Sequence, residues 1–329
     1  MRALSLDELC DLVLNAENPL ILMHCRPDGD TIGSAAALMH IFRALGREPR
    51  ALSPDPLPRR LSFITEGLDM TAPDLSRDYT VITVDVASRG QLGALKDTLV
   101  GRLAPVLMID HHERGEAYAD HYIRPNAAAA GEIIYELALR MHERGMLPAL
   151  SQELVNSIFA AISSDTGCFK FSNTTEKTHL AAAHLLSLGA DASEINRRLF
   201  DIKSLEQLRA EGYVQSHLQI HPSGRIAWTV ITHAIRDSLG LLDEHFETAI
   251  DIVRALKGIE VAIAIKESPD GRYKASFRSI GLDVAAIAAS LGGGGHVRAA
   301  GCSLSAPSAE AAAAAVVGMV ADALGEKCN

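Results

Sequence analysis

The sequence predicts a two-domain α/β protein: an N-terminal domain with a mostly parallel sheet flanked by helices, and a smaller C-terminal α/β domain with a mixed sheet. The 329 residues exceed what one hydrophobic core comfortably supports. In the first half, short apolar runs alternate with helical patterns, which is typical of buried parallel strands. The second half carries a hairpin pattern across a PDG turn. We therefore expect two separate sheets.

The first half supplies the elements of the parallel sheet. The expected strands are PLILMHC (19–25), YTVITVD (79–85) and APVLMID (104–110). Helical patterns cover 31–46, about 127–144, 151–163 and 178–191. We assign 1–190 to the N-terminal domain and the polar stretch 191–215 to a helical linker, which leaves 216–329 for the second domain.

The second half predicts a strand, a helix and a hairpin in turn. The strand is IAWTVIT (226–232), a helical stretch follows at about 237–257, and the hairpin spans 261–279. The expected end of the chain is a helix at 282–291, the loop GGGGH (292–296) and an Ala-rich helix at about 308–324.

Composition restricts the possible partners. Hydrophobic residues make up 48% of the chain and charged residues 22%, which indicates an ordered globular protein. The net charge of -10 argues against binding to duplex nucleic acid, which depends on neutralising phosphates. An acidic cluster that repels phosphate attracts it once divalent cations are bound. Contacts with nucleic acid should therefore be local and metal-dependent.

Cysteine usage and the absence of a targeting pattern favour a cytoplasmic location. The five cysteines are widely spaced and form no CxxC pair, so neither a disulfide framework nor a zinc knuckle is indicated. The N-terminal residues lack a signal-peptide pattern, and no apolar run reaches the ~18 residues of a membrane span. We expect no membrane partner.

Three polar side chains gather in one loop after the first strand. His24, Asp28 and Asp30 lie in HCRPDGDTIGS, where an imidazole and two carboxylates suit divalent ions such as Mn²⁺ or Mg²⁺. Gly29 should allow the sharp turn between the carboxylates, and Gly33 should let the helix approach the strand. The alternative is that both carboxylates cap the helix and the imidazole merely ends a strand.

Polar residues also end the next two strands. Asp85 closes YTVITVD, and Asp110-His111-His112 closes APVLMID. Since the carboxyl ends of parallel strands gather ligands at one edge, these residues should meet. Asp165, in SSDTGCFKFSNTT, is a further candidate. Each alone could be a loop carboxylate or surface turn, but together they suffice for a pair of divalent ions.

The second domain carries a candidate phosphate-binding motif, GGGGHVRAAG (292–301). Consecutive glycines can expose backbone N–H groups to a phosphate, and neighbouring basic side chains can add contacts. The expected substrate-binding residues of this motif are Gly293, Gly294, Gly295, His296 and Arg298. A glycine run is otherwise a flexible loop. Lys274 is a weaker candidate, and Arg278 on the same strand could equally be a solvated side chain.

Taken in order, HCRPDGDTIGS, VDVAS, DHH, SDTGCF and GGGGHVRAAG resemble the DHH/DHHA1 phosphoesterase family over nearly the whole chain. Within that family, the length and layout resemble bacterial oligoribonucleases that also dephosphorylate 3'-phosphoadenosine 5'-phosphate (pAp).

The resemblance implies a role for each candidate. His24 and Asp28 would bind one Mn²⁺, and Asp30, His111 and Asp165 the other, with Asp85 bridging both; Mg²⁺ or Co²⁺ could substitute. His112 would face the scissile phosphate, with Asp110 orienting its neighbours. Arg278 would bind substrate.

The expected activity is two-metal hydrolysis of short single-stranded RNA or DNA, or of nucleotides such as pAp, in a cleft between the domains. A homodimer is the family expectation. The alternatives are a linear or cyclic dinucleotide phosphodiesterase, a RecJ-type single-strand exonuclease, a family II pyrophosphatase, and a catalytically silent nucleotide-binding module. A silent module would be expected to lack one of the six ligands, and all six are present.

Overall fold

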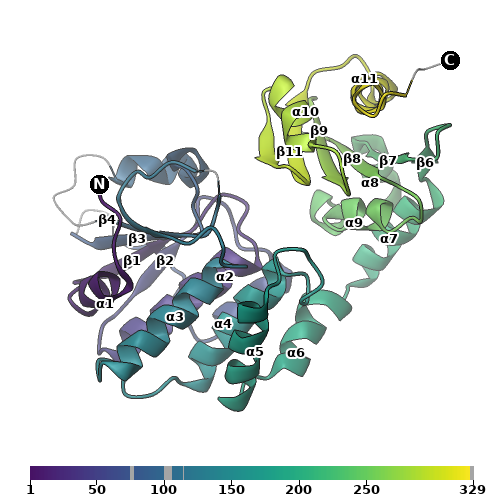
Figure 1. Cartoon of the computed structure of the whole chain (residues 1–329). Helices are drawn as coiled ribbons and strands as arrows, with labels where there is room; N and C mark the ends of the chain where they lie inside the picture. Colours follow the sequence, from purple (N-terminus) through teal and green to yellow (C-terminus); the bar gives the residue numbers. More distant parts are fainter. Residues whose placement is uncertain (75–77, 100–105, 114, 327–329) are drawn as a thin grey trace. The chain divides into compact units, whose positions relative to one another are not determined.

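The computed structural model describes residues 1–74, 78–99, 106–113 and 115–326, and the chain divides into two compact units, 1–202 and 203–329 (Figure 1). Residues 104 and 105 of the third expected strand, and Cys328, lie outside the described residues. Among the described residues, no helix is both long and apolar enough to cross a membrane.

Unit 1 is built on a five-stranded sheet in which neighbouring strands are parallel, as the sequence predicted. The strand order is β2-β1-β3-β4-β5. Because β1 lies between β2 and β3, the order reverses at β1, and ligands of open α/β sheets bind beside such a point. The strands are β1 Pro19–Leu22, β2 Arg50–Leu52, β3 Thr80–Val84, β4 Val106–Asp110 and β5 Asp120–Ile123.

Helices cover the sheet of unit 1, and two of them approach each other closely. A Cβ on Gly33 of α2 would lie 2.8 Å from the Ser157 oxygen of α4, and one on Gly29 would lie 2.2 Å from Ser164 Oγ. We expected Gly33 to let the helix approach the strand and Gly29 to make the turn. Both glycines instead allow the close approach of α4 to α2. The helices are α1 Leu6–Leu14, η1 Arg59–Thr65, η2 Arg89–Leu99, α2 Gly29–Ala44, α3 Ala130–Glu143, α4 Gln152–Asp165, α5 Glu176–Ser187, α6 Ala192–Asn196 and η3 Arg197–Asp201.

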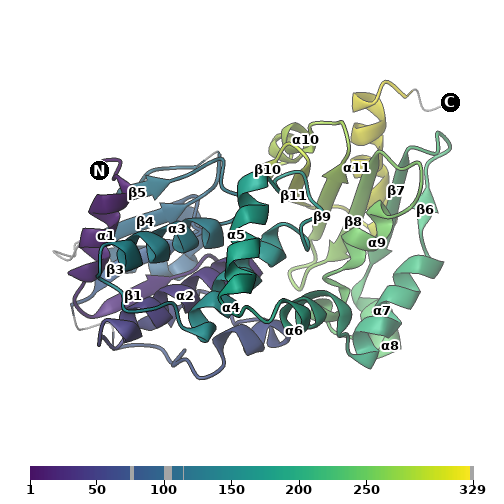
Figure 2. The ribbon, with the colours of Figure 1, turned by 60° about the horizontal axis from the view of Figure 1, so that its bottom comes forward.

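Unit 2 contains the mixed sheet that the sequence predicted. Its order is β10-β11-β9-β8-β7-β6 (Figure 2), and β7 and β8 run parallel while the other neighbours are antiparallel. The strands are β6 Gln219–Ile220, β7 Ile226–Ile231, β8 Val261–Glu267, β9 Tyr273–Ser279, β10 Gly294–His296 and β11 Ala299–Leu304.

The helical stretch expected at about 237–257 consists of three short helical segments. Gly240, with φ of +64°, ends the first of them in the left-handed conformation. The helices are α7 Leu205–Ser216, α8 His233–Leu239, η4 Asp243–Phe246, α9 Ala249–Arg254, α10 Val284–Ser290 and α11 Ala309–Ala323.

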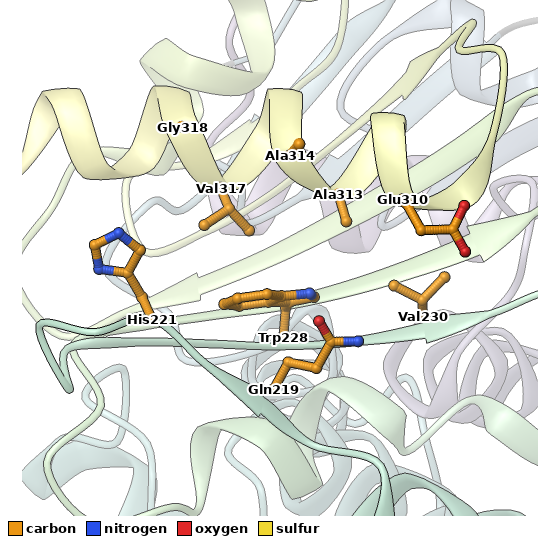
Figure 3. A pocket seen from close by; sticks show the side chains of 9 residues that line it. All are labelled: Gln219, His221, Trp228, Val230, Glu310, Ala313, Ala314, Val317 and Gly318. Carbon is orange, nitrogen blue, oxygen red and sulfur yellow. The ribbon is translucent and has the colours of Figure 1, made fainter. Parts of the chain in front are cut away.

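The two faces of this sheet have separate cores. Phe277 packs with residues of α10 and α11, whereas Ala262 packs with residues of α7 and α9. A pocket of about 360 Å³ lies between α11 and strands β6 and β7, with Trp228 as its aromatic wall (Figure 3). Trp228 pairs with Ile263, which pairs with Phe277, so the pocket is on the α10–α11 side. Arg278 follows Phe277 and therefore points to the opposite face.

Candidate metal centre and phosphate-binding face

The polar strand ends of unit 1 come together at one edge of its sheet. His24 lies two residues beyond β1, Asp85 directly follows β3, and Asp110 is the last residue of β4. Asp165 reaches them from the last position of α4. The side chains form three overlapping groups of potential metal ligands: His24, Asp28 and Asp85; Asp30, His111 and Asp165; and Asp85, His111 and His112. The third group joins the first two through Asp85 and His111.

The first group consists of His24, Asp28 and Asp85, whose ligand atoms lie within 4.8 Å of one another. Nε2 of His24 is 3.4 Å from Asp85 Oδ2 and 3.8 Å from Asp28 Oδ1. Its Nδ1 lies 2.8 Å from the Cys25 carbonyl oxygen, which holds the ring with Nε2 toward the carboxylates. Asp28 also caps α2 by accepting from the Asp30 and Thr31 N–H groups. The capping alternative and the metal alternative are therefore compatible.

The second group consists of Asp30, His111 and Asp165. Nε2 of His111 lies 3.6 Å from Asp30 Oδ2 and 3.9 Å from Asp165 Oδ2. Its Nδ1 lies 3.2 Å from the Ala127 carbonyl oxygen. As with His24, a backbone carbonyl orients the ring so that the other nitrogen faces carboxylates.

Asp85 stands between the two groups. Its Oδ2 faces His24, while its Oδ1 lies 3.4 Å from Nε2 of His111. The residue has φ of +59°, which is uncommon for a residue with a side chain and bends the chain sharply after β3. Oδ1 is buried and has no hydrogen-bond partner among the described residues. A buried carboxylate oxygen in that state is suited to accept a cation.

His112 and Asp110 form a hydrogen-bonded pair beside these groups. Nδ1 of His112 lies 2.7 Å from Asp110 Oδ1. Asp110 is 1% exposed, and its Oδ2 has no partner among the described residues. A buried carboxylate on Nδ1 fixes the imidazole and makes it more basic.

The imidazoles of the centre favour their charged forms. Burial opposes the charge of His24, but the facing carboxylates of Asp28 and Asp85 outweigh it and raise the pKa of His24 to about 11. Burial is likewise outweighed at His111, where Asp85 and its neighbouring carboxylates raise the pKa, and at His112, where Asp110 raises the pKa.

The carboxylates respond to burial and to one another. Burial, together with the charge of Asp85, raises the pKa of Asp30 well above its ordinary value. Burial raises the pKa of Asp165 to about 7. Burial alone would also raise the pKa of Asp85, but the imidazoles of His111 and His24 hold that pKa below its ordinary value. The cluster thus carries closely spaced negative charge that needs a positive counterpart.

This donor set fits divalent ions. Within the described residues, neither Lys nor Arg forms an ion pair with the buried Asp30, Asp85 or Asp110. Mixed imidazole and carboxylate ligands suit Mn²⁺ and related ions, and two neighbouring groups that share a carboxylate suit a pair of them.

In unit 2, Arg278 and His296 lie on one face of the sheet. Arg278 on β9 pairs with Ala299 on β11, and Ala299 pairs with His296 on β10. Residues directly opposite in adjacent strands project to the same side, so a methyl group separates the two basic side chains. Arg278 donates to the Phe277 carbonyl oxygen, burial lowers its pKa, and no described carboxylate lies within ion-pair distance. An unpaired guanidinium of this kind is suited to bind phosphate.

The glycine run has a structural role that the sequence did not reveal. The expectation that all four N–H groups face a ligand is not met, because those of Gly292 and Gly293 donate to the Ala289 and Ala288 carbonyls. Gly294–His296 forms edge strand β10 rather than a loop. A Cβ on Gly293 would lie 2.2 Å from the Gly301 oxygen, so glycine is required there by close backbone packing.

The two remaining sequence candidates lie nearby. Arg298 is exposed in the turn between β10 and β11, and its carbonyl oxygen accepts from the Ser279 N–H group. Lys274 is exposed on β9, four residues from Arg278 and on the same strand face.

Sequence reasoning missed the residues that hold the ligands. Asn173 donates to Asp165 Oδ2 at 3.2 Å, and the backbone N–H groups of Ala130 and Gly131 donate to Asp30. Asn173 stood in the SSDTGCFKFSNTT motif, which could have suggested it. Backbone N–H donors cannot be recognised from a sequence pattern, because every residue except proline has one.

Comparisons with known proteins identify both domains. The DHH family, N-terminal domain, matches residues 18–162, and the DHHA1 domain matches 231–322. A bifunctional oligoribonuclease and PAP phosphatase NrnA of Thermus thermophilus is 29% identical over 90% of this chain and 87% of its own.

Two further proteins extend the comparison. The cyclic-di-AMP phosphodiesterase PdeA of Listeria monocytogenes is 26% identical over 88% of this chain and 45% of its own. An exopolyphosphatase-related protein from Bacteroides fragilis shares the fold, with a TM-score of 0.87, 22% identity and coverage of 97% and 95% of the two chains. The chain is therefore a DHH-family phosphoesterase with a C-terminal DHHA1 domain.

Proposed function

We propose that this protein is a Mn²⁺-dependent phosphodiesterase that hydrolyses short oligoribonucleotides to mononucleotides and converts pAp to AMP. The observation that carries the proposal is the presence of two groups of three potential metal ligands, joined by Asp85 of the first group and His111 of the second. The full-length similarity to a bifunctional oligoribonuclease and PAP phosphatase supports this choice of substrates.

The two ligand groups assign the metals. His24 and Asp28 would hold one ion and Asp30, His111 and Asp165 the other, while Asp85 would contribute to both sites. When bound, such ions lower the pKa of a water nucleophile and neutralise charge on the phosphate.

His112 is the proposed catalytic residue. Its Nδ1 is held by Asp110, so Nε2 is the nitrogen that would meet the scissile phosphate. Burial opposes the charge of His112, but the carboxylate of Asp110 outweighs it and raises the pKa, which favours a protonated ring. As the phosphorus–oxygen bond breaks, that proton would pass to the departing oxygen or stay hydrogen-bonded to the phosphate.

Arg278 and His296 would bind a second phosphate of the substrate. They lie in one row across the sheet with Ala299 between them, so one anion could contact both basic groups. A substrate held at two phosphates would be a short nucleotide rather than inorganic phosphate.

A second candidate is the hydrolysis of a linear or cyclic dinucleotide. It is favoured by the similarity of this chain to a cyclic-di-AMP phosphodiesterase over 88% of the chain. Both candidates use the same metal centre and the same phosphate-binding face, so they differ only in the preferred substrate.

A substrate panel with Mn²⁺ tests the proposal. It contains RNA and DNA from dinucleotides to long single strands, pAp, linear and cyclic di-AMP, and pyrophosphate, each with and without EDTA. Fast cleavage of the shortest RNAs and pAp, declining with length, is the expected result. Preference for cyclic di-AMP would favour the second candidate. Preference for long strands or pyrophosphate, or full activity in EDTA, would refute the proposal.

A further inference from the structure

One short backbone segment contacts two residues of the second ligand group directly and is joined to the third through Asn173. The segment is 127–131, which leads into α3. The N–H groups of Ala130 and Gly131 donate to Asp30 Oδ2 at 2.7 Å and Oδ1 at 2.9 Å. The carbonyl oxygen of Ala127 lies 3.2 Å from His111 Nδ1. The segment therefore fixes the orientation of both side chains.

The third member, Asp165, is joined to the same segment through Asn173. Nδ2 of Asn173 donates to the Ala128 carbonyl oxygen at 2.9 Å, the Asp165 carbonyl oxygen at 3.1 Å and Asp165 Oδ2 at 3.2 Å. Because all three neighbours are acceptors, only the amide nitrogen can face them. Asn173 thus ties the Asp165 carboxylate and the end of α4 to segment 127–131.

Two further side chains hold the segment in place from the other side. Oε2 of Glu132 accepts from the Ala128 N–H group at 3.2 Å and from Thr178 Oγ1 at 3.0 Å. Glu132 is 3% exposed and Thr178 is fully buried. Buried hydrogen bonds of this kind have few alternative partners, so the segment is held rigidly.

The first ligand group is supported by different contacts. Nδ1 of His24 lies 2.8 Å from the Cys25 carbonyl oxygen, and the Cys25 N–H group donates to the Gln91 carbonyl oxygen at 2.7 Å. No hydrogen bond found among the described residues joins His24, Asp28 or Asp85 to segment 127–131. Segment 127–131 therefore supports the second group directly, whereas the first group is linked to it indirectly, through the Asp28 contact with the Asp30 N–H group and the Asp85 contact with His111.

We propose that segment 127–131 and Asn173 position the ligands of one metal site only, so that this site can be weakened while the other is kept. Asn173 is a positioning residue in this proposal, and the inference rests on the proposed two-metal function. Residues that orient metal ligands typically change metal affinity by about 10- to 100-fold when replaced.

The test compares Asn173→Ala and Asn173→Asp with the wild type by Mn²⁺ titration calorimetry and by electron paramagnetic resonance. We expect the wild type to bind two ions and Asn173→Ala to bind one of them about 10- to 100-fold more weakly. The exchange-coupled signal of a paired centre should then appear only at higher Mn²⁺. Asn173→Asp should be weaker still, because it places a carboxylate against Asp165. Excess Mn²⁺ should restore kcat in Asn173→Ala.

Asn156→Ala is the matched control. Asn156 also contacts a helix end, since its Oδ1 accepts from the Asp191 N–H group, and in the described ranges no hydrogen bond joins it to segment 127–131. It should bind Mn²⁺ like the wild type. Thr178→Val removes the hydroxyl group that donates a hydrogen bond to Glu132. It provides an independent variant if Asn173→Ala unfolds.

The outcomes separate the two proposals. Two unchanged sites in folded Asn173→Ala and Thr178→Val, or equal weakening of both sites, would overturn the positioning role. Absence of Mn²⁺ binding by the wild type would instead overturn the two-metal function itself.

Discussion

Oδ2 of Asp85 lies 3.4 Å from Nε2 of His24, while the other oxygen of the same carboxylate turns toward the second ligand group. This arrangement follows from position: Asp85 ends the strand between β1 and β4, so ligands approach it from both sides. Asp85 has a positive φ, and its buried Oδ1 accepts no hydrogen bond from the part of the chain that the structure describes; both features suit a residue held in place for a bound cation.

Replacing Asp85 by Asn should remove activity without unfolding the protein. Asn keeps the shape but lacks the charge that both sites share, so the loss should exceed the ~100-fold typical of residues that only support ligands. Calorimetry should show that both Mn²⁺ sites are weakened, unlike Asn173→Ala. Asp120→Asn on β5 of the same sheet is the control. Retention of tight binding of two ions would contradict the shared role.

Metal binding should release protons. The pKa of His24 is raised to about 11 by Asp28 and Asp85, so without metal the ring is protonated at pH 7. A metal ligand must be neutral, so Mn²⁺ has to displace that proton. The apparent affinity should therefore increase as pH rises from 6 to 8. Calorimetry in buffers of different ionisation enthalpy measures the protons released, and a binding enthalpy that is the same in every buffer would refute the prediction.

The free energy of unfolding of the metal-free protein should decrease as the pH rises from about 4 to about 7. Burial raises the pKa of Asp165 to about 7, above its unfolded value of 3.8, so the folded state binds this proton more tightly. Stability from this group is present at low pH and is lost as the carboxyl ionises in the folded protein. Urea titrations in EDTA should show a shallower decline in Asp165→Asn. An unchanged pH dependence in that variant would show that other groups cause the decline.

Sequence reasoning located the site because its main residues end buried apolar runs. His24, Asp85 and Asp110 follow strands whose pattern is clear, and the sheet topology brings such ends together. By contrast, β5 (Asp120–Ile123) is short and half polar, so its sequence pattern did not predict a strand. The support from segment 127–131 could not be predicted, because a backbone N–H group that donates to a carboxylate distant in the sequence has no residue signature.

The glycine run shows the limit of motif reading in unit 2. The sequence suggested a loop of free N–H groups, whereas Gly293 is required by contact with the β11 backbone. That requirement depends on a strand pairing of β10 with β11, which the sequence did not predict. The pairing of Arg278, Ala299 and His296 in one row across three strands was hidden for the same reason.

Arg278→Ala should raise KM for oligoribonucleotides and pAp while leaving Mn²⁺ binding unchanged. A hydrogen bond to a charged group is worth about 1.5–3 kcal/mol, or roughly a 10- to 100-fold rise in KM. Arg272→Ala is the matched control, since Arg272 is exposed at the start of the same strand and donates to the Ser303 carbonyl oxygen. Equal KM values for Arg278→Ala and Arg272→Ala would place the second phosphate elsewhere.

Ala299→Leu should block the same face without removing any charge. Ala299 lies directly between Arg278 and His296, and side chains on opposed residues have Cβ atoms about 4.5–5.5 Å apart, so a leucine would fill the space for an anion. Ala314→Leu provides the contrast, because Ala314 lines the pocket on the opposite sheet face (Figure 3). KM measurements on pAp should show impairment of Ala299→Leu and not of Ala314→Leu, with Mn²⁺ titrations equal in both. The reverse pattern would mean that the substrate binds the face of the sheet that carries Trp228.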